Sequence, residues 1–395
     1  MLSATEAPSL RPAVATSIGV ECIDDLAGFA ALRPEWNALL RSSGADGPFL
    51  TWEWLHTWWK HLRGTSALRI FTVRAGDELI AVAPLRVSRG TLAWFTQLEF
   101  LGTGHAGSDY LDLIARRGHE DQAIRAIATV VQSQRGGGKP DAPTALRLDH
   151  VPYDSLASRL ATALSTDSWD VSIGPGGTCP IVRLAGHDWD SYLATLGSAH
   201  RANVRRRLKA LGQRFDVRFE LVVSEEQRRA ALAALVAFHD QRFSDRGGST
   251  TFFTPALRAF HDEATRSALD CGWLRMYVLR LNDAPAAVMY GFDYRQRFYF
   301  YQHGFDDQYK AHSVGLALMA LSIQAALEGG AEEFDMLWGV EPYKRLWAHD
   351  ARQLRQIHLF PAHLGGTIHR HAIQARWHLG RLARRVLTTG DTSAT

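Results

Sequence analysis

Three side chains in the second half of the sequence have the chemistry to move protons. His303 ends the apolar, β-rich run "RFYFYQHGF", and histidine changes charge near neutral pH, which suits a general base. Asp335 lies in "EEFDMLW", where alternation puts its carboxylate opposite Phe334 and Met336, a costly position unless the group is paired or functional. Tyr343 follows in "EPYKRLW". The alternatives are a packing histidine, a paired carboxylate and an aromatic anchor.

A segment suited to an anion lies between His303 and Asp335. The sequence "HSVGLALMALSIQAALEGG" predicts a helix that begins near Ser313, with Gly315 in its first turn. Glycine inside a helix costs roughly 1 kcal/mol, so Gly315 indicates that its backbone needs room. Free N–H groups and the positive dipole end favour a phosphate there, and Ser313 could cap the helix. The alternative is a glycine at a packing contact.

Two hairpins position these segments. Residues 68–85, "LRIFTVRAGDELIAVAPL", and residues 274–291, "LRMYVLRLNDAPAAVMYG", share Leu, Arg, Arg, Asp, Ala and Val at equal positions. Each pairs two β-rich runs around a turn, at Gly76-Asp77 and Asn282-Asp283. A helical segment precedes each hairpin, and a strand, a helix and another strand follow it. The chain therefore looks duplicated, and we predict two α/β units.

Three segments follow from this organisation. We place an N-terminal domain at residues 1–180 and a C-terminal domain at 181–360, separated near the Gly/Pro segment "IGPGGTCP". From Ala351 to Gly390 there is no Asp or Glu, and residues 361–395 read as a basic helical tail carrying Trp377. Such a helix can lie on an anionic membrane surface or dock on its own protein, and both alternatives stay open.

Composition narrows the class of protein. A chain of 395 residues with 46% hydrophobic residues can build two or three cores, and a net charge of +3 does not indicate a nucleic-acid partner. The cysteines Cys22, Cys179 and Cys271 lack metal-ligand spacing, so we expect no metal and a reducing compartment. The sequence shows no signal peptide and no spanning segment. We expect a cytoplasmic protein, with attachment to the inner face of the cell membrane left open.

The order of elements in the second half resembles the GNAT acyltransferase superfamily. Its phosphate loop is usually written Q/R-x-x-G-x-G/A, and "HSVGLA" matches the glycine and the small residue but departs at His312. The run from Gly315 to Trp347 is similar to the BioF2-like or CelD-like acetyltransferases, tandem GNAT proteins related to the FemAB aminoacyl transferases. "PFLTWEWLHTWW", "GSDYLD" and "HRANVRRRLKAL" share this resemblance, which implies an α/β (α+β) fold of two tandem GNAT-like domains, each a mixed twisted sheet flanked by helices.

The resemblance also implies roles for the candidate residues. His303 flanks the thioester of acyl-CoA, Asp335 acts as a base or orients one, and Tyr343 protonates the CoA thiolate. Lys344 pairs with a phosphate or with Glu341. The remaining residues expected to bind acyl-CoA form the loop at the helix start: His312, Ser313, Val314, Gly315, Leu316 and Ala317.

The acceptor amine is expected in the cleft between the domains. Asp109 and Tyr110 of "GSDYLD" lie near that cleft, where a carboxylate could hold an amine, and His239 and Arg242 would lie on a lid. The acceptor is a small-molecule or lipid amine, such as a long-chain base or an amino sugar of a surface glycan. The Trp-rich segment at 49–62 lines an acyl tunnel or belongs to the core.

The predicted function is an acyl-CoA-dependent N-acyltransferase. A FemAB-like transferase that uses aminoacyl-tRNA is an alternative that a basic helix near residues 200–209 permits, although the near-neutral charge speaks against nucleic acid. A degenerate GNAT scaffold without turnover is a third alternative, because His312 replaces the usual Gln or Arg.

Overall fold

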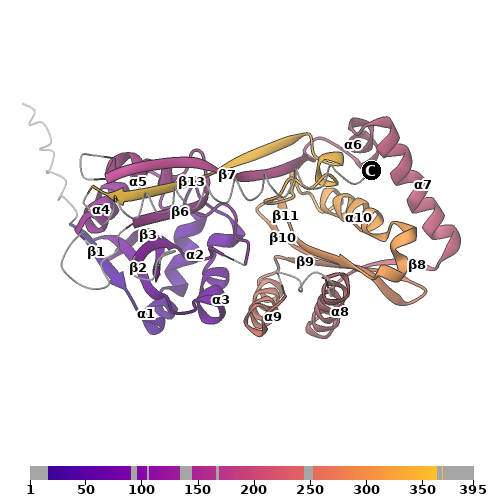
Figure 1. Ribbon diagram of the computed structural model, residues 1–395, viewed down its shortest axis with the longest axis horizontal. Helices are drawn as coiled ribbons and strands as arrows, with labels where there is room; N and C mark the ends of the chain where they lie inside the picture. Colours follow the sequence, from indigo (N-terminus) through magenta and orange to yellow (C-terminus); the bar gives the residue numbers. More distant parts are fainter. Residues whose placement is uncertain are drawn as a thin grey trace, which may run out of the picture.

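The computed structural model describes residues 17–89, 96–104, 106–133, 145–165, 169–243, 252–362 and 367. Its strands form one mixed sheet with helices on both faces, which confirms the predicted α/β class (Figure 1). The predicted C-terminal tail helix lies outside the described residues. Within the described residues, no helix has the length and apolar character needed to cross a membrane.

The first half of the chain runs from β1 to β7. Thr51 begins the aromatic helix of this half by accepting a hydrogen bond from the Trp54 N–H. Trp54, Trp58 and Trp59 of this helix are buried in the core rather than lining a tunnel. The elements are β1 (Ile18–Ile23), α1 (Leu26–Ala31), α2 (Arg33–Arg41), η1 (Pro48–Leu50), α3 (Trp52–Leu62), β2 (Ala67–Ala75), β3 (Glu78–Arg89), β4 (Thr96–Phe100), β5 (Ile114–Ala115), α4 (Glu120–Ser133), β6 (Ala145–Pro152), α5 (Leu156–Leu164) and β7 (Trp169–Arg183).

The second half repeats the hairpin, strand, helix and strand of the first. Its elements are α6 (Trp189–Thr195), α7 (Ser198–Arg214), β8 (Val217–Leu221), α8 (Glu225–Phe243), α9 (Pro255–Asp270), β9 (Leu274–Leu281), β10 (Ala284–Tyr294), β11 (Arg297–Phe305), η3 (Asp307–His312), α10 (Val314–Glu328), β12 (Glu333–Asp335), η4 (Lys344–Leu346) and β13 (Asp350–Pro361). Both predicted hairpins form as antiparallel pairs, β2 with β3 and β9 with β10. Sequence reasoning missed α9, which Thr254 caps and Pro255 begins.

The strand order shows how the halves join. It runs β1-β2-β3-β4-β6-β13-β7-β12-β11-β10-β9-β8, and β4 pairs with β6 as β11 pairs with β12, in parallel. The last strand of each half leaves its own unit: β7 pairs with β12 of the second half, and β13 pairs with β6 of the first. The boundary predicted at residue 180 falls within β7, and the division into domains stays a prediction.

Two apolar cores lie on either side of the second-half strands. One lies under α6, α7 and α10, while the other continues from α8 and α9 into the first half. In the shared core the Trp54 ring lies 5.0 Å from Phe260, 5.6 Å from Phe292 and 5.3 Å from Tyr301. The halves therefore bury a common aromatic cluster.

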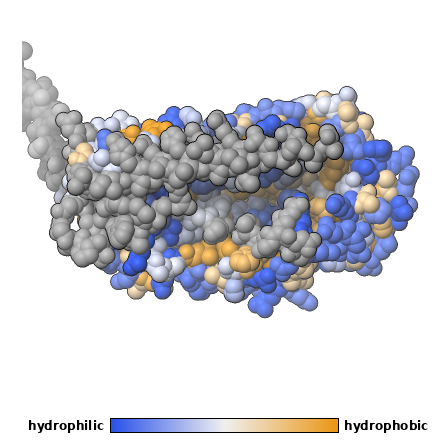
Figure 2. Space-filling view, in the orientation of Figure 1, coloured by the Kyte–Doolittle hydropathy of each residue, from blue (hydrophilic) through white to orange (hydrophobic). Residues whose placement is uncertain are grey.

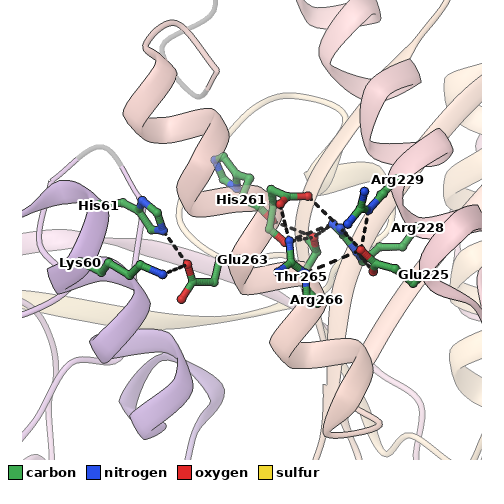
Figure 3. Close-up of polar contacts among 10 residues, drawn as sticks. Lys60, His61, Glu225, Arg228, Arg229, His261, Glu263, Thr265 and Arg266 are labelled. Atoms are coloured by element: carbon green, nitrogen blue, oxygen red, sulfur yellow. Dashed lines mark hydrogen bonds and ion pairs between the residues drawn. The ribbon is translucent and has the colours of Figure 1, made fainter. Parts of the chain in front are cut away.

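Charged side chains tie the helices around this cluster (Figure 3). The fully buried Arg228 of α8 bonds to Glu225 and to Asp262 and Thr265 of α9. Across the junction, the Glu263 carboxylate of α9 accepts hydrogen bonds from Lys60 at 2.7 Å and His61 at 2.8 Å, both on α3. Helix α9 is thus fixed to both α8 and the first half.

The junction pair at Glu263 is expected to contribute little stability. Lys60 is half exposed, and exposed pairs typically contribute 0.2 to about 1 kcal/mol. We expect Glu263→Gln to lower the free energy of unfolding by about 0.5 kcal/mol at low salt and by less at high salt. Urea unfolding at two salt concentrations measures this. A loss above about 2 kcal/mol would show that the pair governs how the halves dock.

Candidate functional site

The site begins where β11 and β12 separate. These parallel strands pair only at Arg297↔Glu333, Phe298↔Phe334 and Tyr299↔Asp335. Strand β12 ends at Asp335, whereas β11 continues to Phe305. Among the described strands, none pairs with this edge of β11 beyond Tyr299. A wedge therefore opens between the second half of β11 and the chain that follows β12.

A pocket of about 520 Å³ fills this wedge. Its walls come from the end of β11, the start of α10, the C-terminal end of α8, the first turn of α7 and the η4 segment. Most of its lining is aromatic or aliphatic, with a few polar groups, as in small-molecule sites. The lining residues are His200, Phe238, His239, Arg242, Gln302, His303, Gly304, Phe305, Gly315, Leu316, Met319, Glu341, Tyr343, Leu346 and Trp347.

The start of α10 offers backbone donors beside this pocket. Among the described residues, nothing accepts a hydrogen bond from the N–H groups of Val314 and Gly315, while those of Leu316 and Ala317 bond to the Ser313 carbonyl at 3.0 and 3.1 Å. A Cβ on Gly315 would lie 3.3 Å from the Phe305 ring. Two free donors at the positive end of a 15-residue helix suit an anionic group.

The rest of the predicted loop needs correction. Ser313 does not cap α10 through its side chain, and it adopts a left-handed backbone with φ +58° instead. The side chains of Val314 and Ala317 are fully buried in the core, so only their backbone can meet a ligand. The His312 ring packs edge-on against Phe215 at 5.0 Å and does not line the pocket.

Two of the three predicted catalytic residues meet in the pocket. The rings of His303 and Tyr343 lie 5.8 Å apart, and neither ring nitrogen of His303 has a hydrogen-bond partner within the described part of the chain. Burial, with the nearby charges of His239, Arg242 and Lys344, lowers the pKa of His303 to about 3. Burial raises the pKa of the Tyr343 hydroxyl. At neutral pH the pocket thus holds a neutral imidazole and a protonated phenol.

Asp335 lies elsewhere, which corrects the prediction that it shares a site with His303. Its fully buried carboxylate accepts hydrogen bonds from the Tyr110 hydroxyl at 2.6 Å and the Leu337 N–H at 2.9 Å, and Arg352 lies 3.2 Å away. It does not line the pocket in the wedge. Burial raises its pKa to about 6, although these three partners oppose the shift.

The four residues predicted to bind the acceptor do not lie in one site. Asp109 is buried, with its carboxylate accepting from the Trp338 N–H at 2.8 Å and facing His150 at 3.0 Å, so it joins the two halves. Tyr110 is held on Asp335 and lines a second, polar pocket of about 400 Å³. His239 and Arg242 instead line the wedge pocket, where the His239 Nε2 contacts the His303 carbonyl at 3.0 Å. Both residues therefore lie at the wedge pocket, and their role in an acceptor-side lid stays a prediction.

Lys344 is occupied by protein groups. Its buried ammonium donates to the Trp338 carbonyl at 2.9 Å and pairs with Glu341 at 3.2 Å. This geometry corresponds to the Glu341 alternative and leaves the phosphate alternative without support. The described residues hold no cluster of His, Cys, Asp or Glu that could bind a metal ion.

Sequence reasoning missed two groups at these sites. His200 lines the wedge pocket and packs edge-on against Trp347 at 4.6 Å, and Arg352 pairs with Asp335 from β13. The segment "HRANVRRRLKAL" contains His200, but its pattern was interpreted only as the positive face of a helix. Nothing in the sequence of β13 indicates that Arg352 reaches a carboxylate on another strand.

The chain is similar to one protein family and to several solved structures. Residues 198–345 match the family described as "Acetyltransferase (GNAT) domain". The crystal structure of FemX aligns with a TM-score of 0.57 and 13% identity over 86% of this chain and 97% of that one. The C-terminal domain of a putative lysylphosphatidylglycerol synthetase from Agrobacterium fabrum aligns with a TM-score of 0.54 and 12% identity over 88% and 96%. No curated protein sequence matches the chain.

The match to the GNAT domain supports an acyltransferase, and the wedge pocket lies largely within the matched segment. Residues 198–345 match the GNAT domain, and the chain as a whole has a fold similar to that of FemX, with the strands of both halves in one sheet. The predicted resemblance is therefore confirmed.

Proposed function

We propose that the protein transfers an acyl group from acyl-CoA to the nitrogen of an amine. The observation that carries this proposal is the wedge between β11 and β12, with two free N–H groups at the start of α10. The pyrophosphate of CoA is anionic and suits these donors. The pantetheine arm carries amides, which suit the unpaired edge of β11, and the apolar walls suit the acyl end.

The transfer itself requires three events. The amine nitrogen attacks the thioester carbonyl, the C–N bond forms, and the nitrogen loses a proton to a base. The C–S bond then breaks, and the leaving thiolate takes a proton from the Tyr343 hydroxyl, which is restored by the proton released from the amine. His303 is our candidate for the base, because its imidazole faces the pocket and is unprotonated at neutral pH; burial also makes it a weaker base than a free histidine.

An aminoacyl-tRNA donor is the second candidate. It is supported by the FemX-like fold and by the exposed cations of α7, where Arg205, Arg206 and Lys209 point away from the buried Val204 and Leu211. The chemistry at the amine would be the same, since an ester carbonyl replaces the thioester.

Thermal stabilisation separates the two donors. We expect acetyl-CoA or palmitoyl-CoA at 100 times its Kd to add about 2.7 kcal/mol to the stability, and charged tRNA to add none. In Gly315→Glu the gain from CoA is expected to vanish, because the new side chain meets Phe305 and places a negative charge at the anion site.

Gly212→Glu is the matched control, since Gly212 is also helical and has open space where a Cβ would lie. It should retain the full gain. A shift with CoA that survives Gly315→Glu, or a shift with charged tRNA alone, would contradict the acyl-CoA proposal.

A further inference from the structure

An exposed apolar loop lies at the mouth of the wedge pocket. In the segment 336–347, which we call the η4 loop, Trp338 is 57% exposed, Val340 52% and Leu346 49%. Leu346 also lines the pocket, whereas the Trp338 ring lies over Gly177 of β7. Large apolar side chains gathered in one short loop differ from the single exposed residues that are normal on a protein surface.

The η4 loop packs against a basic helix. Trp347 at the end of the loop contacts His200 of α7, and its carbonyl accepts a hydrogen bond from Tyr192 of α6 at 3.1 Å. The outer face of α7 carries exposed Arg205, Arg206 and Lys209, and Arg345 of the loop is exposed as well. Figure 2 shows this end of the molecule, on the right, mainly in the blue of hydrophilic residues.

We propose that the η4 loop and the outer face of α7 together bind an anionic lipid bilayer. Exposed Trp, Val and Leu side chains can enter the boundary between headgroups and acyl chains, while neighbouring cations attract acidic headgroups. A nucleic acid would use the cations of α7 but would gain nothing from burying Val340 and Leu346. The combination of the two kinds of side chain therefore favours a lipid surface.

This contact places the mouth of the pocket against the bilayer. A lipid amine is then the acceptor class that the surface favours, a step that rests on the proposed function. The bilayer contact itself needs neither CoA nor turnover, so the two proposals can fail separately.

Vesicle co-sedimentation of the full chain tests the contact. We expect binding to vesicles of phosphatidylcholine and phosphatidylglycerol in equal parts, and little binding to phosphatidylcholine alone. The double variant Trp338→Ser/Val340→Ser and the triple variant Arg205→Gln/Arg206→Gln/Lys209→Gln should each bind about tenfold more weakly or worse. High salt should weaken the wild type but have a smaller effect on the triple variant.

Matched variants on the first half control for general effects. Ile173→Ser removes an apolar side chain that is 54% exposed on β7, and Arg89→Gln/Arg117→Gln/Arg125→Gln removes three exposed cations. Both should bind vesicles like the wild type. The basic tail is unchanged in every variant, so any difference comes from the altered surface.

Three outcomes would overturn the proposal. Binding that persists in both test variants would place the membrane contact elsewhere, and equal losses in the control variants would reduce it to general charge. Unfractionated tRNA could bind the wild type and bind the α7 variant more weakly, while vesicles bind both proteins equally. The surface would then be a nucleic-acid site. Acetyl-CoA stabilisation of the test variants should stay intact, which separates loss of the surface from loss of the pocket.

Discussion

Asp335→Ala is expected to lower the free energy of unfolding by about 3 to 5 kcal/mol. The truncation removes the acceptor of two buried donors, the Tyr110 hydroxyl and the Leu337 N–H, and takes one carboxylate from Arg352. Each unsatisfied buried group costs about 1 to 3 kcal/mol. Because Tyr110 belongs to the first half and Asp335 to the second, the loss should weaken the junction between them. Urea unfolding measures it.

Asp335→Asn should cost less and should change the pH dependence of stability. The folded pKa of Asp335, about 6, exceeds the ordinary value for an unfolded carboxyl near 3.9. The protonated Asp335 therefore contributes to the free energy of unfolding fully below about pH 4, and this contribution is lost as the pH rises through about 6. The asparagine carries no such proton, so the variant should lose less stability than the wild type across that range.

Asp350→Ala provides the control for both Asp335 variants. Asp350 is 48% exposed and pairs with Arg183, so its removal should cost less than about 1 kcal/mol. A cost for Asp335→Ala as small as that of the control, or identical pH profiles for Asp335→Asn and the wild type, would show that the carboxylate is not the buried link described here.

His303→Ala is expected to lower kcat by about 100-fold at most, because a base with a pKa near 3 contributes less than one whose pKa matches the working pH. Because burial holds the pKa of His303 near 3, its imidazole stays neutral across roughly pH 5 to 9. Titration of His303 should therefore not lower the wild-type rate in that range. Release of free thiol from acetyl-CoA in the presence of an amine panel follows the reaction.

Tyr343→Phe separates the acid from the base. It keeps the ring that packs against His303 and removes only the hydroxyl, so we expect a smaller loss, because water can protonate the thiolate. Thermal stabilisation by acetyl-CoA should persist in both variants. Turnover that is unchanged in His303→Ala would remove His303 as the base and would leave His200, which also lines the pocket, as the next candidate.

Local patterns predicted the elements well because local physics forms them. The alternating runs around Gly76 and Asn282 became hairpins, and the glycine at the start of the predicted helix 313–328 lies at the first turn of α10 beside the pocket. The sequence also indicated the short strand at "EEFD", but the wedge it leaves beside β11 beyond Tyr299 is visible only in the structure.

Long-range pairings could not be predicted in this way. Asp335 was recognised as unusual, but its partners Tyr110 and Arg352 lie 225 residues before it and 17 after it, and no local period connects them. Asp109 was placed at a cleft, whereas the fold closes that region around His150 and Trp338. Registers between distant strands decide which charges are buried together, and hydrophobic patterning does not encode them.

The exchange of strands between the halves has a consequence during synthesis. Among the described strands, β7 pairs only with β12 and β13, and β13 covers the edge of β6, so these partners of β7 are translated more than 145 residues after it. As the chain leaves the ribosome, β7 is unpaired and β6 is an open edge until residue 361 emerges. Such edges invite pairing with other chains. The interval between synthesis of the first half and emergence of residue 361 is thus the stage at which this protein most needs a chaperone.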